Sequence, residues 1–290
     1  MVALTVGLAV FVGIALGLLG GGGSILTVPL LAYVAGMDAK AAIATSLLVV
    51  GVTSAVGAIS HARAGRVQWR TGLIFGAAGM AGAYLGGVVA RFIPGTVLLI
   101  GFAVMMIATA IAMLRGRKNI AETAETQRIP LAKILAEGLV VGLVTGLVGA
   151  GGGFLVVPAL ALLGGLPMPI AVGTSLIVIA MKSFAGLAGY LSSVHIDWTL
   201  ALMVTAAAVV GALIGARLTA MVNPDSLRKA FGWFVLAMSS VILAQEIHLA
   251  VGATAAALTA VAGVLFISCT KYGHCPLRRL TQLRHLPATS

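Results

Sequence analysis

Charged residues are scarce in this chain, which has 290 residues: Asp, Glu, Lys and Arg make up 9% of them, whereas hydrophobic residues make up 60%. A soluble domain carries about 25% charged residues, because its surface must be solvated by water. So little charge excludes a soluble enzyme, and such high hydrophobicity also excludes a disordered chain. The mean hydropathy of +1.14 agrees with both exclusions.

Other missing sequence features exclude further classes of protein. The two cysteines, Cys269 and Cys275, are too few for a disulfide framework. No basic helix with interleaved aromatic residues is present, so the net charge of +11 does not predict nucleic-acid binding. The apolar stretches are continuous over about 18 residues or more, which argues against the alternating strands of a β-barrel. Met1 leads straight into such a stretch with no basic segment, so no cleaved signal peptide is expected.

The apolar segments predict an all-α, polytopic membrane protein. Most are long enough to cross a hydrocarbon core about 30 Å thick, which takes about 20 helical residues. Segments 25–36 and 154–166 are too short, and each follows a cluster of glycines. The segments cover residues 2–19, 25–36, 39–60, 71–90, 96–114, 131–148, 154–166, 170–191, 198–221, 227–244 and 249–270.

The two halves of the chain repeat each other. LGGGGSILTVPLL at 19–31 matches VGAGGGFLVVPAL at 148–160, so Pro29 aligns with Pro158 at an offset of 129 residues. An ungapped match over about 65 residues indicates internal duplication, which is common in secondary transporters. The same offset pairs Thr45-Ser46-Leu47 with Thr174-Ser175-Leu176, Ser54 with Ser183, Trp69 with Trp198, Gly82 with Gly211 and Gly86 with Gly215.

The distribution of Lys and Arg predicts how the repeats are oriented. Loop 61–70 is rich in arginine, whereas its equivalent before Trp198 has no Lys or Arg, and the next pair of loops has the opposite bias. Cytoplasmic loops accumulate Lys and Arg, so this reversal favours inverted repeats. The N-terminus is then outside, while loops 61–70 and 115–133 and the basic tail are inside.

Inversion requires an odd number of crossings in each repeat. Three full helices and one re-entrant pair meet this condition, the pairs being 2–19 with 25–36 and 131–148 with 154–166. Segment 2–19 is long for half of such a pair, and if it crosses the membrane the repeats are parallel instead. The expected divisions are a first transmembrane repeat (1–114), a cytoplasmic linker (115–133), a second transmembrane repeat (134–245), an additional transmembrane helix (246–270) and a basic cytoplasmic tail (271–290).

The duplicated glycine clusters are the first candidate site. Consecutive glycines disfavour a continuous helix, and irregular backbone at membrane depth survives only inside protein or beside a watery cavity. Pro29 and Pro158 each suit the first turn of a new helix, so extended chain is expected over 24–28 and 153–157. Free N–H groups and a positive helix end would bind an anion there, unless the glycines serve only close packing. The candidate ligands are Gly21, Gly22, Gly23, Ser24, Gly151, Gly152 and Gly153.

Hydroxyl groups and one lysine extend this candidate anion site. Thr45-Ser46 and Thr174-Ser175 lie about two turns into their helices and could donate to an oxyanion. Alternatively, each hydroxyl bonds the carbonyl one turn back. Lys182 is the one basic residue well inside a predicted span, where an ionisable group is a functional candidate by default. It could instead extend its charge to the interface.

The remaining titratable residues point away from a cation or metal site. His61 could titrate as a gate or be an inert interfacial residue, and no metal site, cofactor or catalytic group is predicted. The tail combines Cys269, His274 and Cys275, a weak metal pattern, with Arg278, Arg279 and Arg284, which suit anionic lipid headgroups. The acidic residues are all expected in loops or near helix ends, so none should lie mid-membrane; they are Asp38, Glu122, Glu125, Glu137, Asp197, Asp225 and Glu246.

These motifs give the chain a family resemblance. GGGGSILTVPLL, its duplicate GAGGGFLVVPAL, and the downstream ATSL and GTSL resemble the sulfite exporter TauE/SafE family over residues 1–245. The resemblance implies export or exchange of small sulfur-containing anions such as sulfite, sulfonates or sulfoacetate. The expected partners are a small anionic substrate and the lipid bilayer of the cell's inner membrane, with no nucleic acid, and a homo-oligomer is left open.

Three alternatives remain at this stage. An intramembrane enzyme would need a nucleophile–base pair or metal ligands within the spans, and the sequence offers none there. A non-transporting scaffold or sensor would not need polar groups that converge in both repeats. A transporter of another small organic anion would need the same groups as a sulfur-anion transporter.

Overall fold

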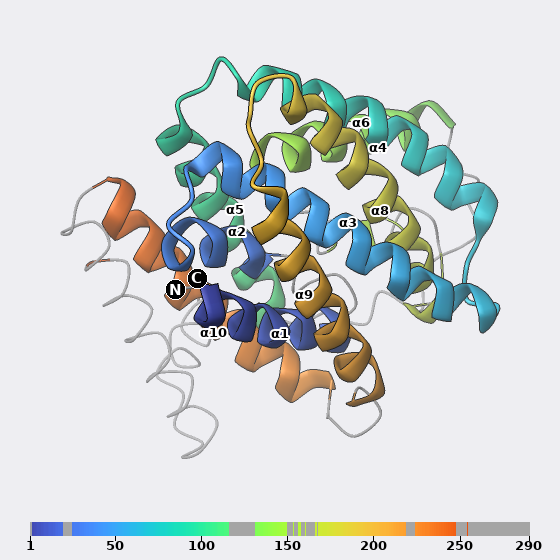
Figure 1. The fold of residues 1–290 in the computed structure, drawn as a ribbon. Coiled ribbons are helices and arrows are strands. Elements are labelled where there is room, and N and C mark those ends of the chain that lie inside the picture. Colours follow the sequence, from blue (N-terminus) through green and yellow to red (C-terminus); the bar gives the residue numbers. More distant parts are fainter. Residues whose placement is uncertain are drawn as a thin grey trace, which may run out of the picture.

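The computed structural model describes residues 2–19, 25–115, 131–149, 153, 156–157, 160, 166, 168–218, 224–247 and 254. Every regular element among them is a helix, as Figure 1 shows. The elements are α1 (Val2–Leu19), α2 (Thr27–Pro29), the π-helical turn η2 (Leu30–Val34), α3 (Ala39–Arg63), α4 (Trp69–Ala90), α5 (Gly95–Arg115), α6 (Leu131–Val148), α8 (Met168–Leu191), α9 (Trp198–Leu218) and α10 (Pro224–Glu246).

The lengths and surfaces of these helices suit a membrane. Those long and apolar enough to cross it are Ala39–Arg63, Trp69–Ala90, Ile170–Leu191 and Trp198–Leu218, and shorter apolar helices accompany them. Large apolar side chains also face outward: Leu202 is 60% exposed and Phe11 is 58% exposed. An exposed apolar surface of this kind is stable when it contacts lipid. The predicted all-α membrane fold is confirmed.

The glycine clusters end helices, as the sequence predicts. Helix α1 stops at Leu19, directly before the first cluster, and α6 stops at Val148. Gly149 then adopts a φ of 73°, a left-handed conformation that glycine reaches without a steric penalty. Both helices therefore end where the duplicated sequence changes from apolar residues to glycine.

The two repeats exchange their first helices. Helix α1 packs against α9, and its equivalent α6 packs against α4, so each repeat covers the other (Figure 1). A Cβ atom at Gly82 would collide with the carbonyl oxygen of Leu139, and one at the equivalent Gly211 would collide with that of Val10. The other contacts that recur at the same offset are Gly86–Leu143 with Gly215–Ile14, Gly142–Gly79 with Gly13–Ala208, and Gly146–Ala83 with Gly17–Ala212.

The equivalent helices α3 and α8 contact each other and run in opposite directions. Gly57, late in α3, faces Leu176, early in α8, whereas Leu47, early in α3, faces Gly186, late in α8. Equivalent helices that lie antiparallel are the arrangement that an inverted duplication requires.

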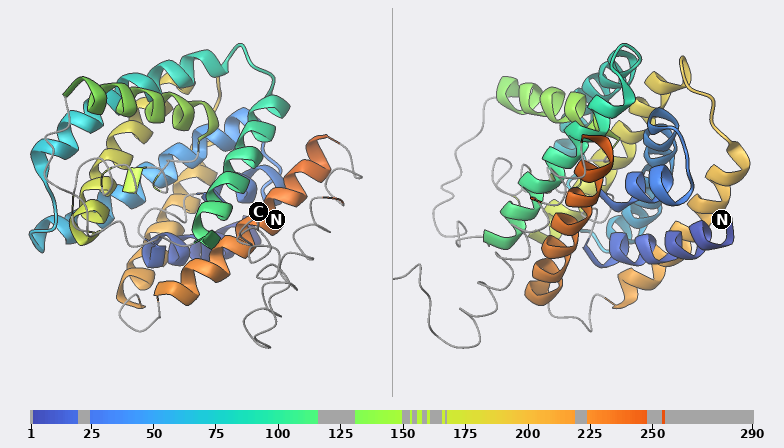
Figure 2. Two further views of the ribbon diagram at one scale, coloured as in Figure 1. Left: turned by 180° about the vertical axis from the view of Figure 1, so that it is seen from behind. Right: turned by 90° about the vertical axis from the view of Figure 1, so that its left-hand side faces the viewer.

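Helices α5 and α10 form a second pair of equivalents. They lie along each other on one flank of the molecule (Figure 2). A Cβ atom at Gly232 of α10 would lie 3.1 Å from Cγ of Leu114 in α5. At the far end of α10, the Tyr33 hydroxyl of η2 donates to Glu246 Oε1 at 3.1 Å. Helix α5 of this flank also contacts α3, one of the two inner helices that carry candidate residues.

Candidate functional site

The first glycine-rich break contains helix where the sequence predicts extended chain. Residues 25–26 form a 3-10 turn that leads directly into α2, and residues 153 and 156–157 of the second break are also helical. The prediction is therefore wrong for these residues, although Pro29 does lie in the first turn of α2, as expected. An extended segment would leave backbone groups without partners in a nonaqueous interior, whereas a short helix pairs them internally.

Most of the glycine ligands proposed from the sequence cannot be placed. Gly153 is buried and helical. The others lie outside the described residues, so the predicted backbone N–H site stays a prediction; they are Gly21, Gly22, Gly23, Ser24, Gly151 and Gly152.

The repeated Thr-Ser pairs are fully buried, and three of their four hydroxyls are engaged by the protein. The Ser175 hydroxyl donates to a carbonyl of its own helix, which is the alternative to an anion-binding role. Thr45 is the exception, because its Oγ1 has no hydrogen-bond partner among the described residues. The three contacts are Ser46 Oγ to the Gly149 carbonyl oxygen (2.5 Å), Ser175 Oγ to the Val172 carbonyl oxygen (2.8 Å) and the Gln68 N–H to Thr174 Oγ1 (3.0 Å).

Lys182 lies deep inside α8 and is 1% exposed. Its Cβ is 3.8 Å from the position that a Cβ would take at Gly79, near the middle of α4. Its Nζ is buried and has no hydrogen-bond partner in the described part of the chain. A lysine that reaches the interface would expose its ammonium group, so that alternative does not hold in this structure.

Lys182 lies near the point where α3 and α8 cross. The facing pairs Leu47–Gly186, Gly51–Phe184 and Gly57–Leu176 bring residues 52–54 level with residues 179–183. Equivalent residues of two repeats can face each other only near the axis that relates them. The crossing, defined here as residues 52–54 and 179–183, is therefore the centre of the duplicated fold.

Two hydroxyl groups at the crossing are functional candidates that the sequence analysis did not single out. Ser54 is 2% exposed and its equivalent Ser183 is fully buried. Neither Oγ atom has a hydrogen-bond partner within the described ranges. The available signal was their alignment inside matching apolar spans, but hydroxyls are common there. The structure thus places, in the same stretch of α3 and α8, two hydroxyls and one ammonium group that have no hydrogen-bond partner among the described residues.

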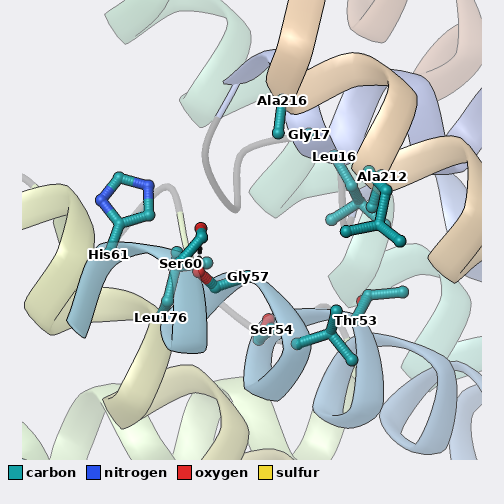
Figure 3. A pocket seen from close by; sticks show the side chains of 12 residues that line it. Leu16, Gly17, Thr53, Ser54, Gly57, Ser60, His61, Leu176, Ala212 and Ala216 are labelled. Carbon is teal, nitrogen blue, oxygen red and sulfur yellow. Dashed lines mark hydrogen bonds between the residues drawn. The ribbon is translucent and has the colours of Figure 1, made fainter. Parts of the chain in front are cut away.

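A pocket of about 60 Å³ leads toward the crossing (Figure 3). One wall is α3, from the exposed Ser60 and the half-buried His61 down to Ser54, and the opposite wall includes Ala216 of α9 and Gly17 of α1. A water molecule needs about 10–15 Å³ of such space, so the pocket has room for a few waters or a small ion. His61 Nδ1, which is buried, has no partner among the described groups.

The equivalent position on the other side of the crossing is closed. A Cβ at Gly87 of α4 would lie 2.5 Å from the carbonyl oxygen of Gly186 in α8, so the two backbones touch. Tyr190, the equivalent of His61, is fully buried, and its hydroxyl donates to the Leu147 carbonyl oxygen at 2.6 Å. The crossing can therefore be approached through the pocket beside His61 and is blocked beside Tyr190.

Comparison with known proteins agrees with the sequence motifs. The family model described as sulfite exporter TauE/SafE matches residues 5–242. The chain belongs to this family. A probable membrane transporter protein of Xylella fastidiosa (strain 9a5c) is 36% identical over 244 residues, which covers 82% of this chain and 94% of the relative.

Two relatives from Bacillus subtilis (strain 168) extend the comparison. The probable membrane transporter protein YdhB is 29% identical, with 75% of this chain and 90% of the relative covered. The probable membrane transporter protein YunE is 30% identical, with 71% and 82% covered. No solved structure matches the chain. This TauE/SafE chain is a membrane transporter, and the predicted family resemblance is confirmed.

One carboxylate of this TauE/SafE transporter lies partly buried in a helix. Glu137 lies inside α6, and the carbonyl oxygen of the next residue, Gly138, is 3.7 Å from the Cβ position of Gly79. Its Oε2 is buried and has no partner in the described structure. Glu137 lies within the first two turns of α6, so the prediction that every carboxylate lies in a loop or near a helix end stays a prediction.

The other polar candidates that the structure describes add no ligand to the candidate site. Asp38 caps α3 by accepting the N–H of Lys40 at 3.1 Å, and Asp197 caps α9, as loop carboxylates do. Within the described residues, no group of three or more His, Cys, Asp or Glu side chains could hold a metal ion. The tail residues Cys269, His274, Cys275, Arg278, Arg279 and Arg284 lie outside the described residues.

Proposed function

We propose that this TauE/SafE transporter exports or exchanges small sulfur-containing anions, such as sulfite or organosulfonates, across the inner cell membrane. The observation that carries the proposal is the buried Nζ of Lys182, which lacks a partner among the described residues. A charge in an apolar interior needs an opposite charge or a water-filled path close by. A transported anion supplies that charge for part of the transport cycle.

The nearby carboxylate does not take this role. Oε2 of Glu137 is also without a partner among the described residues, so it does not neutralise Lys182 in this arrangement. The pocket beside His61 gives a small anion a route toward the crossing. The family description, sulfite exporter, favours a sulfur oxyanion over other small organic anions. In this proposal the glycine-rich breaks contribute backbone N–H groups to the same region.

The proposal includes inverted repeats with the anion bound near the membrane midplane. The antiparallel packing of α3 against α8 supports it, because inversion requires equivalent helices to run in opposite directions. The arginines of loop 61–70 favour a cytoplasmic location for that loop. The pocket then opens toward the cytoplasm, as an exporter that is ready to load its substrate requires.

Flux through the reconstituted full chain tests the proposal. Proteoliposomes are given radiolabelled sulfite, sulfate, methanesulfonate or acetate, and protein-free liposomes correct for passive leak. We expect protein-dependent, saturable flux of sulfite or methanesulfonate that the unlabelled sulfur anions inhibit. Flux of acetate alone would assign a different substrate, and the absence of flux for all four anions would overturn the proposed function.

A further inference from the structure

We infer that Ser54 and Ser183 are substrate ligands, and that together with Lys182 they bind an XO₃-type oxyanion headgroup at the crossing of α3 and α8. The inference rests on the proposed function, because it names the groups that hold the transported anion. Ser54 and Ser183 are equivalent in the two repeats, and both are at most 2% exposed. Their Oγ atoms have no partner in the described part of the protein.

Many buried hydroxyls in the described helices bond their own backbone. A buried hydroxyl inside a helix normally donates to a carbonyl oxygen three or four residues earlier. Side chains that follow this rule in the structure are Thr53, Thr109, Thr145, Ser175, Thr205, Ser239 and Ser240. Four buried hydroxyls depart from it among the described residues, those of Thr27, Thr45, Ser54 and Ser183, and of these only Ser54 and Ser183 are equivalent to each other in the two repeats. A bound ligand explains why both hydroxyls are held available rather than turned onto their own helices.

The donors at the crossing suit one class of headgroup. The lysine ammonium offers three donor hydrogens, and each serine hydroxyl offers one. Ser54 belongs to α3, whereas Lys182 and Ser183 belong to the antiparallel α8, so in this inference the ligand is held from two helices. A sulfonate or sulfite group presents three acceptor oxygens that point apart, whereas a planar carboxylate presents two. The crossing should therefore bind sulfonates and sulfite more tightly than carboxylates of similar size.

The pocket supports the same assignment. Ser54 is one of its lining residues, so its buried hydroxyl lies next to the space that opens on the His61 side. Lys182 and Ser183 of α8 do not line the pocket, and the side chain of Lys182 packs beside Gly79 of α4. An entering anion would therefore meet the hydroxyl of Ser54 before it meets the ammonium group of Lys182.

Alanine variants of the two serines test the inference. Ser54→Ala, Ser183→Ala and the double variant are purified as full chains, and binding of sulfite, methanesulfonate and acetate is measured together with flux. Loss of one hydrogen bond to an anion should raise Kd and KM about tenfold or more. Ser239→Ala is the matched control, because Ser239 is 1% exposed and its hydroxyl is already bonded to the Leu236 carbonyl oxygen. Its constants should stay within about twofold of the wild type.

The outcomes separate this inference from the proposed function. Wild-type constants in both alanine variants, alongside sulfite flux by the wild-type protein, would overturn the serine site alone. Binding of a different anion that depends on both serines would keep the site and overturn the sulfur substrate. If an alanine variant does not fold, Ser54→Thr and Ser183→Thr decide: retained binding supports a hydroxyl ligand, and lost binding counts against it. If the wild type binds no anion, both ideas fail.

Discussion

At the scale of single residues, the crossing carries one positive charge rather than two. Lys182 of the second repeat is equivalent to Thr53 of the first, whose hydroxyl donates to the Val49 carbonyl oxygen at 2.7 Å. Two lysines at this centre would repel each other in an apolar interior. One ammonium group balances one negative charge, so a singly charged headgroup such as a sulfonate or hydrogensulfite suits the site best.

Removal of this charge is the first prediction. Lys182→Met keeps the apolar stem, and we expect it to raise the substrate KM severalfold or to stop transport, while Lys182→Arg retains partial activity. Folding should be preserved, because loss of a buried charge without a partner among the described residues is not destabilising. Proteoliposome flux, with expression and thermal stability measured alongside, checks both points. Wild-type transport by Lys182→Met would leave only hydroxyl and N–H groups as anion ligands.

Individual residues were predictable from the sequence only where their chemistry is conspicuous. A lysine inside an apolar run is visible at once, so Lys182 was identified. Ser54 and Ser183 align with each other in the two repeats. The sequence does not predict them as anion ligands, because most hydroxyls in such helices bond their own backbone. Which hydroxyls lack a partner among the described residues became visible only in the folded structure.

At the scale of helices, the two repeats pack differently on either side of the crossing. Helices α4 and α8 touch through Gly87 and Gly186, whereas the equivalent region between α9 and α3 holds the pocket. Because the two repeats are similar in sequence, their arrangements can exchange at modest energetic cost. Such an exchange would close the pocket and open the Tyr190 side, as alternating access requires.

A cysteine pair tests this exchange. Ser60 and Ala216 line the pocket and are equivalent to Gly189 and Gly87, where a Cβ at Gly189 would lie 3.0 Å from Cα of Gly87. In the exchanged state, cysteines at 60 and 216 should therefore come close enough to form a disulfide. We expect oxidation to cross-link them and stop transport, and reduction to restore it.

The background for this experiment is a chain in which Cys269 and Cys275 are replaced by serine. Each single cysteine, at 60 or at 216, serves as the control and should transport normally after oxidation. If the pair never cross-links, with or without substrate, the pocket is a fixed feature and the two sides do not exchange.

Glycine contacts between helices give a prediction about stability. Gly82→Ala and Gly211→Ala each place a Cβ against a backbone carbonyl of the partner helix, so either change should destabilise the protein by about 1–3 kcal/mol. Gly101→Ala is the control, since no atom lies within 4 Å of its Cβ position. It should be neutral or stabilising by up to about 1 kcal/mol. Thermal unfolding in detergent compares the three variants, and equal melting temperatures would refute the packing role.

Helix bounds were largely predictable, because apolar runs bounded by glycine, proline and charge define them. The segments 2–19 and 131–148 match α1 and α6 residue for residue. The extended segments were predicted wrongly because a run of glycines permits a break in a helix without determining the conformation of the next residues. The unpaired backbone of an extended segment is costly away from water, so the chain resumes helix by residue 25.

At the scale of the whole molecule, neither repeat forms a closed unit. Helix α1 packs on α9 and α6 packs on α4, so each repeat depends on the other for its buried surface. The sequence could predict the duplication, but not this exchange of helices, because a repeat offset does not say which copy supplies a contact. The exchange joins the two halves while leaving α3 and α8 together at the centre.

Membrane topology is the last prediction, and the direction of transport depends on it. Arg66 and His195 are both exposed and lie in the equivalent loops that join α3 to α4 and α8 to α9. In a chain without other cysteines, we expect a cysteine at position 66 to react with an impermeant maleimide only from the cytoplasm. A cysteine at position 195 should react only from outside, because the equivalent helices before these loops run in opposite directions. Reaction of both from one side would contradict inverted repeats, and with them the cytoplasmic opening of the pocket.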